Sequence, residues 1–270
     1  MTTTIFKILL TPALIWAVSL AGRRWGAAVS GLLIGLPLTS GPVALFIALE
    51  SGRAFARQTA SGILLGSISV ALFCLVYAWL AARRWPWPAA MAGGWLATML
   101  STLALDRVRA SGLVALAIAA VVILTLNWLM PHAGEGAESG AAPWWDIPAR
   151  MVVATSFVVA LTTVAPALGA HLSGLLATLP IYASILVCFN HALFGSPQAI
   201  RFARGLALGL FGFIAFFAAL EALLAVAPLW LSFGAASLAA LATQAALGWF
   251  THARAARLPT PDASRFVSLG

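Results

Sequence analysis

The residues best suited to chemistry are polar side chains that lie inside long apolar stretches. Glu221 is the most deeply placed, within the stretch 202 to 226, and Asn190 and His191 lie near the end of the stretch 170 to 193. An ionisable side chain is costly in hydrocarbon and should face the interior of a helix bundle. The position of Glu221 therefore predicts a role in proton or cation coupling. The alternative is that Glu221 makes a structural hydrogen bond. We expect Asn190 and His191 either to contact a substrate or to lie at the membrane interface.

Proline, glycine and small hydroxyl residues recur at matching places in two of the apolar stretches. They are Pro37, Thr39, Ser40 and Gly41 in the first, and Thr178, Pro180, Tyr182 and Ser184 in the second. Proline removes a backbone donor and clashes with the preceding turn, so each helix should kink or break. Backbone groups freed in lipid are tolerated only beside protein or a water-filled cavity. We expect these residues, with Asn190 and His191, to bind a substrate; plain packing kinks are the alternative.

Basic residues at the edges of the apolar stretches could attract a negatively charged group. These are Arg57, Arg201 and Arg204. Few acidic residues accompany them, which favours an anion, a neutral solute or a lipid headgroup over a polyvalent cation. The sequence has no HExxH, Gly-x-Ser-x-Gly or phosphate-loop pattern. The four histidines are scattered, and Cys74 and Cys188 lie in apolar stretches, so we expect no catalytic activity, no metal and no cofactor.

The overall composition indicates a lipid environment. Of 270 residues, 62% are hydrophobic and 8% are charged, and the mean hydropathy is +1.01. Soluble domains are roughly 45 to 50% apolar and about 25% charged, so the apolar excess must face lipid. The net charge of +8 comes from basic residues between the apolar stretches, and tryptophans mark the ends of these stretches, as in membrane proteins. Nucleic acid is not an expected partner.

A helix needs about 20 apolar residues to cross a bilayer, and the sequence supplies two groups of candidates. The first covers 4 to 22, 27 to 49, 58 to 82, 88 to 105 and 111 to 130; the second covers 149 to 167, 170 to 193, 202 to 226 and 229 to 250. We predict an all-α, polytopic transmembrane bundle of about nine spans. Its parts are a first repeat (1–110), a connecting span with a polar loop (111–147), a second repeat (148–250) and a polar C-terminal tail (251–270).

A shift of 143 residues brings the two groups into register. Residues 22–73 against 165–216 give 16 identities in 52 pairs, without a gap, and these include several glycines and a proline. Because five spans precede the second copy, that copy enters the membrane from the opposite side. We therefore predict two inverted-topology repeats with kinked or broken second helices, a plan found in secondary transporters. The distribution of basic residues predicts an outside N-terminus and a cytoplasmic C-terminus.

A short motif in the first repeat consists of Gly31, Pro37, Glu50, Gly52 and Arg57. In this motif the segment 31–59 resembles the GlpM family of small bacterial inner-membrane proteins. The second copy keeps Gly174, Pro180 and Gly195 and replaces the glutamate and arginine by Leu193 and Ile200. Family members are shorter, so the chain resembles two such units fused around an extra helix. The resemblance implies a multi-pass protein of a bacterial inner (plasma) membrane and leaves the activity open.

These patterns favour a transporter or permease that moves a small solute, an anion or a lipid headgroup through a site between the two repeats. The alternative is a non-catalytic accessory or scaffold subunit of a membrane complex, and a membrane enzyme acting on lipids is a third hypothesis. The expected partners are membrane lipid, a small substrate that the sequence does not identify, and either a second copy of the chain or a membrane partner subunit. A scaffold should tolerate joint substitution of Glu221, His191 and Asn190.

Overall fold

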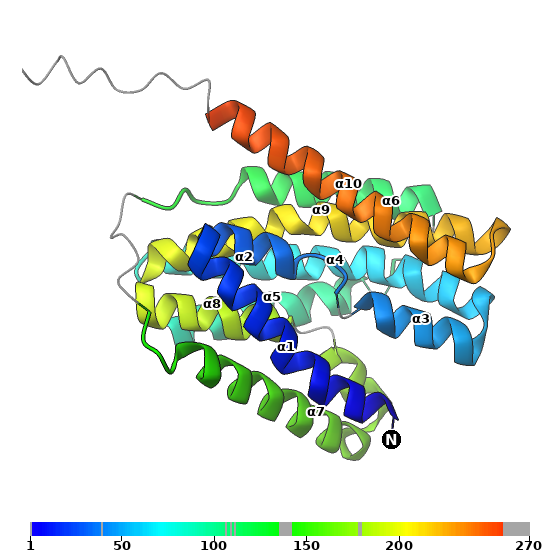
Figure 1. Cartoon of the computed structure of the whole chain (residues 1–270), viewed down its shortest axis with the longest axis horizontal. Coiled ribbons are helices and arrows are strands. Elements are labelled where there is room, and N and C mark those ends of the chain that lie inside the picture. The colour runs from blue at the N-terminus through cyan, green and yellow to red at the C-terminus, as the bar shows by residue number, and fades with distance from the viewer. Residues whose placement is uncertain are drawn as a thin grey trace, which may run out of the picture.

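The structure, a computed structural model, describes residues 2–38, 40–105, 107–108, 110, 112–134, 142–177 and 180–255, and these ranges contain helices and no strands. Most of the helices run roughly along the long axis of the molecule (Figure 1). In chain order they are α1 (Thr2–Trp25), α2 (Ala27–Ile34), α3 (Ser40–Ser51), α4 (Arg53–Ala82), α5 (Trp87–Leu105), α6 (Gly112–Trp128), α7 (Asp146–Ala177), α8 (Ile181–Phe194), α9 (Ser196–Val226) and α10 (Leu229–Ala255).

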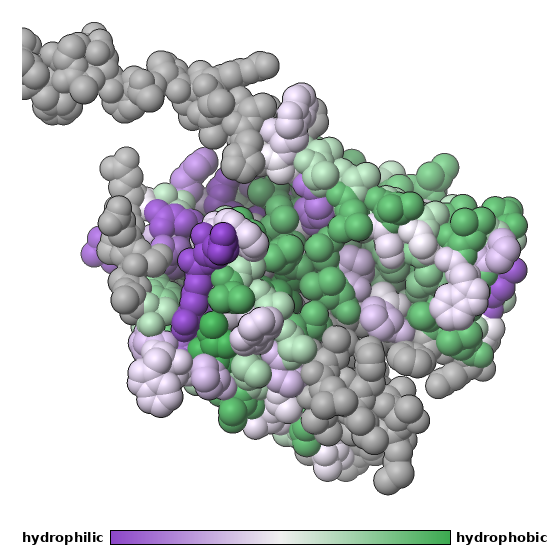
Figure 2. Space-filling view, viewed as in Figure 1, coloured by the Kyte–Doolittle hydropathy of each residue, from purple (hydrophilic) through white to green (hydrophobic). Residues whose placement is uncertain are grey.

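Several helices have the length and composition of membrane spans. Among the described residues, α4, α5, α9 and the Leu229–Trp249 part of α10 are long and apolar enough to cross a membrane, and α6 and α8 are apolar but shorter. Hydrophobic side chains cover much of the middle of the molecule, whereas the most hydrophilic ones gather toward its left end (Figure 2). These are the features of an all-helical protein embedded in a membrane.

The helices are interrupted at both predicted prolines. α2 ends at Ile34, and Pro37 accepts a hydrogen bond from the Gly41 amide at 2.9 Å before α3 continues. In the second half, Pro180 directly precedes α8 with φ of −78° and ψ of 70°, outside the helical region. Proline cannot donate the hydrogen bond that a continuous helix needs. Thr39 and Thr178, which were also predicted at these breaks, lie outside the described residues.

One predicted boundary is wrong. The sequence predicts separate spans at 149 to 167 and 170 to 193, but α7 continues from Asp146 to Ala177 as one helix. In the first half, the corresponding boundary carries Arg23 and Arg24, and Gly26 follows with a φ of +93° that stops α1. Residues 167–170 contain no charged side chain. A loop without polar partners is unfavourable in hydrocarbon, so the helix continues instead.

The centre of the bundle is formed by α4 and α9, which pack side by side along most of their lengths (Figure 1). α2 lies against α9 at very short range. A Cβ atom added to Gly205 would lie 1.9 Å from the carbonyl oxygen of Ala28, and one added to Gly31 would lie 2.1 Å from that of Phe202. Only glycine permits this approach between backbones. A Cβ atom added to either of the matching glycines of α4, Gly62 and Gly66, would have no described atom within 4 Å.

Candidate functional site

The residues predicted around the two helix breaks lie in separate cavities. Pro37 and Gly41 line an apolar cavity of about 540 Å³ together with Phe216. Ser184 lines a different cavity of about 430 Å³ rich in aromatic side chains, and its hydroxyl accepts a hydrogen bond from Trp95 Nε1 at 2.9 Å. The described residues of the two breaks therefore do not form the single polar cavity that the sequence predicts.

Hydroxyl groups after the second break connect neighbouring helices instead. The Tyr182 hydroxyl lies 2.9 Å from the Thr11 hydroxyl, which joins α8 to α1. His191 has its Nδ1 atom 3.1 Å from the buried Tyr77 hydroxyl and its Nε2 atom 3.1 Å from the Ser196 hydroxyl. Both ring nitrogens of His191 are thus used within the protein, where they join α4, α8 and α9. Buried polar groups usually find partners in this way.

Asn190 does lie in a polar cavity, of about 310 Å³. We call it the arginine cavity, and its polar walls come from α1, α2, α7, α8 and α9. The side chains that matter for its chemistry are Ser19, Arg23, Asp146, Arg150, Asn190 and Gln198. Asn190 donates from Nδ2 to the Leu186 carbonyl at 2.9 Å, so its position on α8 is held within the helix itself.

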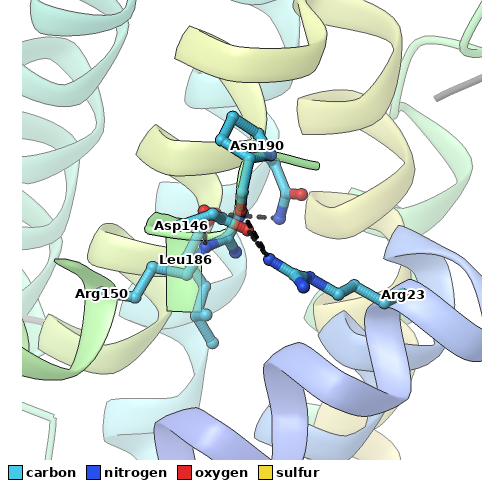
Figure 3. Close-up of polar contacts among 6 residues, drawn as sticks. Arg23, Asp146, Arg150, Leu186 and Asn190 are labelled. Carbon is cyan, nitrogen blue, oxygen red and sulfur yellow. Dashed lines mark hydrogen bonds and ion pairs between the residues drawn. The ribbon is translucent and has the colours of Figure 1, made fainter. Parts of the chain in front are cut away.

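Two arginines converge on one carboxylate in the arginine cavity. Arg150 donates from Nε to Asp146 Oδ1 at 2.6 Å, and Arg23 Nη2 lies 3.3 Å from Asp146 Oδ2 (Figure 3). The side chains of Asp146 and Arg150 are 2% and 5% exposed, and that of Arg23 is 35% exposed. The Arg150–Asp146 pair is therefore shielded from water, whereas Arg23 approaches it from the rim. Arg23 also donates to the Pro143 carbonyl at 3.1 Å.

The local sequence explains why these charges lie where they do. Arg23 belongs to the last turn of α1, and Asp146 belongs to the first turn of α7. Helix dipoles favour positive charge at the C-terminus and negative charge at the N-terminus. Arg150 follows Asp146 by four residues, so the two side chains lie on the same face of α7. Each charge is thus stabilised within its own helix before the helices meet.

The arginine cavity retains unused hydrogen-bond donors. Only Nε of Arg150 hydrogen-bonds within the described residues, while its guanidinium lies 5.3 Å from the centre of the Phe189 ring. The Ser19 hydroxyl is buried without a described partner. α2 begins at this cavity with Gly26, which provides no side-chain cap, and the first amides of a helix lack internal acceptors. With two arginines and one aspartate, the side chains sum to one positive charge, so the cavity suits an anionic group.

The other predicted charged residues lie elsewhere. Arg204 donates to the carbonyls of Met130 and Pro131 at 3.0 and 3.2 Å and so holds the chain after α6. Arg201 is half-buried on the first turns of α9. Arg57 and Glu221 share a cavity of about 560 Å³ at the opposite end of α9. The side chain of Glu50 lies outside the described residues.

Sequence reasoning missed Ser19, Arg23, Asp146 and Arg150. The Asp146–Arg150 spacing of four residues was the available signal, because such pairs mark a helix face. The pairing with Arg23 spans 123 residues, and a contact of that range has no local signature. Comparison with protein families, curated proteins and solved structures finds no match for this chain. The geometry of the cavities is therefore the basis for a functional assignment.

Proposed function

We propose that the protein is a membrane transporter or permease for a small solute that carries an anionic group, and that the arginine cavity binds this group. The observation that supports this most is the convergence of Arg23 and Arg150 on the Asp146 carboxylate inside a polar cavity. Arginine donors recognise carboxylate and phosphate groups strongly, and their electrostatic attraction is greater where water is excluded. A free anion, or the anionic headgroup of a lipid, offers the same recognition chemistry.

The proposed mode of binding follows from the present contacts. Asp146 accepts from one N–H group of each arginine, and an incoming carboxylate or phosphate would compete with it for Arg23, the more exposed partner. The terminal amino groups of Arg150 and the Ser19 hydroxyl would supply further donors. Release of Arg23 from Asp146 would then remove one of the polar contacts that join the end of α1 to the start of α7. Binding and helix movement would be linked through one ion pair.

Two inverted repeats are part of the proposal. With the shift of 143 residues, α3 and α4 correspond to α8 and α9, and their boundaries agree closely: residues 40–51 map onto 183–194 and 53–82 onto 196–225. Gly52 and Gly195 occupy equivalent junctions, and both have positive φ, at +84° and +78°. The arginine cavity takes walls from α1 and α2 of the first unit and from α7, α8 and α9 of the second. Transporters with this plan bind their substrates at the repeat interface.

The proposal is tested by anion binding to the purified full-length chain in nanodiscs. The probes are inorganic phosphate, a monocarboxylate, a dicarboxylate and vesicle-derived phosphatidic acid, with a neutral polyol as the negative control. We expect at least one anionic probe to raise the melting temperature and the polyol to leave it unchanged. Arg150→Lys should weaken that binding about tenfold or more, because it removes the planar fork of donors.

The result that would overturn the assignment is equal stabilisation of wild type and Arg150→Lys, or no response to any anion. Free anions and a lipid headgroup are separated by the probes themselves, since only the phosphatidic acid arm responds if the substrate is a lipid. Arg204→Lys serves as the matched control, because Arg204 also carries a buried-loop contact but lies outside the cavity. That variant should bind the probe with unchanged affinity.

One observation favours the second candidate, a scaffold subunit. Gly62 and Gly66 form a small-residue face on α4 where an added Cβ atom would meet no described atom within 4 Å, although Gly62 also borders the cavity of Arg57 and Glu221; such faces let another helix approach closely. A scaffold would keep its partner when the arginine cavity is altered. Purification of Arg150→Lys and Gly62→Leu variants therefore separates the two: loss of a bound partner only in Gly62→Leu favours the scaffold.

A further inference from the structure

A second polar cavity lies at the other end of α9. Its volume is about 560 Å³, and its polar side chains are Arg57, Gln58, Ser61 and Glu221. The first three come from the beginning of α4, and Glu221 comes from the last turns of α9. Val108 and Ala110, which follow α5, and Gly62 of α4 also line the cavity. We call it the glutamate cavity.

Glu221 is held by one of its two carboxylate oxygens only. Oε1 accepts a hydrogen bond at 2.8 Å from the amide of Gly112, the first residue of α6. Oε2 is buried and has no hydrogen-bond partner among the described residues, and the whole residue is 3% exposed. Nearly all buried polar atoms in proteins have a partner. An orphaned carboxylate oxygen therefore indicates that a donor or a proton binds there.

Among the residues that the structure describes, no positive group forms an ion pair with Glu221. No ion pair joins it to Arg57, although the structure describes both residues. Arg53 donates to the carbonyls of Leu224 and Ala227 at the end of α9. Arg107, in the connection before α6, is exposed. α6 contains no titratable residue, and α10 has none before His252 at its far end.

We propose that Glu221 is a proton-binding site reached through the glutamate cavity. In this step a hydronium ion reaches the cavity from bulk water: one of its O–H bonds breaks and leaves water, an O–H bond forms at Oε2, and the side chain changes from a charge of −1 to neutral. Oε1 keeps the Gly112 hydrogen bond in both states, because a carboxylic acid still accepts through its carbonyl oxygen. The proton form also removes the cost of a buried carboxylate oxygen that lacks a donor.

A metal cation fits the glutamate cavity less well than a proton. Hard cations take about six or more oxygen ligands, and the cavity offers oxygen-bearing side chains only from Gln58, Ser61 and Glu221. The Ser61 hydroxyl already donates to the Arg57 carbonyl at 3.4 Å. The guanidinium of Arg57 in the same cavity would repel a second positive ion. A proton needs only the orphaned oxygen.

Proton binding at Glu221 has a role in transport if the chain carries an anion, so this role depends on the function proposed above. Uptake of one proton at Glu221 would compensate the charge of a monovalent anion in the arginine cavity. The two cavities lie at opposite ends of the same helix, so α9 connects the two binding events directly. The binding of the proton itself does not depend on any transport activity.

The test is an infrared pH titration of the full-length chain in nanodiscs. Acidification of wild type should produce the carbonyl band of a protonated carboxylic acid, and the difference between wild type and Glu221→Gln isolates one carboxyl among the seven acidic residues. Glu221→Gln retains an oxygen that accepts from Gly112. Glu138→Gln, which removes a different carboxyl from the polar loop predicted at 111–147, is the control, and it should keep the band because Glu221 is unchanged.

The proposal is overturned if the difference between wild type and Glu221→Gln contains no carbonyl band that titrates. Glu221→Asp provides a second readout should the glutamine variant fold poorly: it should keep a titrating band with a shifted midpoint. No transported substrate enters the measurement. Failure of this titration would therefore leave the anion-binding result untouched, and failure of anion binding would leave the Glu221 assignment untouched.

Discussion

The Asp146 carboxylate is the shared acceptor of the arginine cavity, so its loss should differ from the loss of either arginine. Asp146→Asn leaves Arg150, whose side chain is 5% exposed, without a counter-charge. Removing one partner of a buried pair costs about 3–5 kcal/mol. Arg23→Gln removes a rim contact and should cost about 1 kcal/mol or less. Urea unfolding in detergent measures the free energy of unfolding of both variants. Similar losses of stability in the two would contradict the shielding of the Arg150–Asp146 pair.

At the scale of residues, the sequence predicted which side chains are candidates for function better than it predicted which of them lie together in one cavity. Glu221 and Arg57 were each selected as charged residues near apolar stretches, and the structure places them in one cavity. Asn190 was also selected, and it lies in the arginine cavity. Asp146 belongs to a polar segment that looks like an ordinary surface loop. Its importance arises from contacts with α1, far away in the sequence, which no local pattern encodes.

At the scale of helices, the two glycine pairs offer a matched comparison. A side chain at Gly205 would collide with the Ala28 backbone, because its Cβ would lie 1.9 Å from that carbonyl oxygen. Gly205→Ala should force α2 away from α9 and destabilise the protein by about 1–3 kcal/mol or more. Gly62→Ala, at the equivalent position of α4, meets no atom within 4 Å and should be neutral or stabilising by up to about 1 kcal/mol.

The comparison is made by measuring the melting temperatures of Gly205→Ala and Gly62→Ala in the same detergent. Equal loss in the two variants would mean that Gly62 also packs closely against another helix. The sequence alone does not indicate which of the two pairs packs within the chain, because the spacing of the glycines is the same in both halves. Helix breaks were easier to predict, since proline acts through its own backbone chemistry. The continuity of α7 was missed because it depends on the absence of polar partners around residues 167–170.

For the whole molecule, the two polar cavities lie at opposite ends of α9. Gln198 and Glu221 are 23 residues apart, which corresponds to about 35 Å of helix, close to the roughly 30 Å of a hydrocarbon core. Buried apolar side chains of α4 and α9 fill the interval between them. Among the described residues, most arginines lie at the end of the molecule that holds the arginine cavity: Arg23, Arg24, Arg83, Arg84, Arg150, Arg201 and Arg204. The other end has Arg53, Arg57 and Arg107.

This arrangement predicts that the two cavities open to opposite sides of the membrane. In a background with Cys74 and Cys188 replaced by alanine, Ala54→Cys reports on the glutamate cavity and Ala142→Cys on the arginine cavity. The positive-inside rule places the arginine-rich end in the cytoplasm. A membrane-impermeant maleimide added to intact cells should therefore label Ala54→Cys, and it should label Ala142→Cys only after permeabilisation.

Each labelling pattern has a distinct meaning. Labelling of both cysteines from outside would contradict the opposed cavities and, with them, the inverted arrangement of the two halves. Labelling of Ala142→Cys alone in intact cells would keep the opposed cavities and reverse the orientation of the chain. Addition of an anion that stabilises the purified protein should then slow labelling at Ala142→Cys by about tenfold when present at ten times its dissociation constant, because the occupied arginine cavity excludes the reagent. Unchanged labelling in that condition would place the bound anion elsewhere.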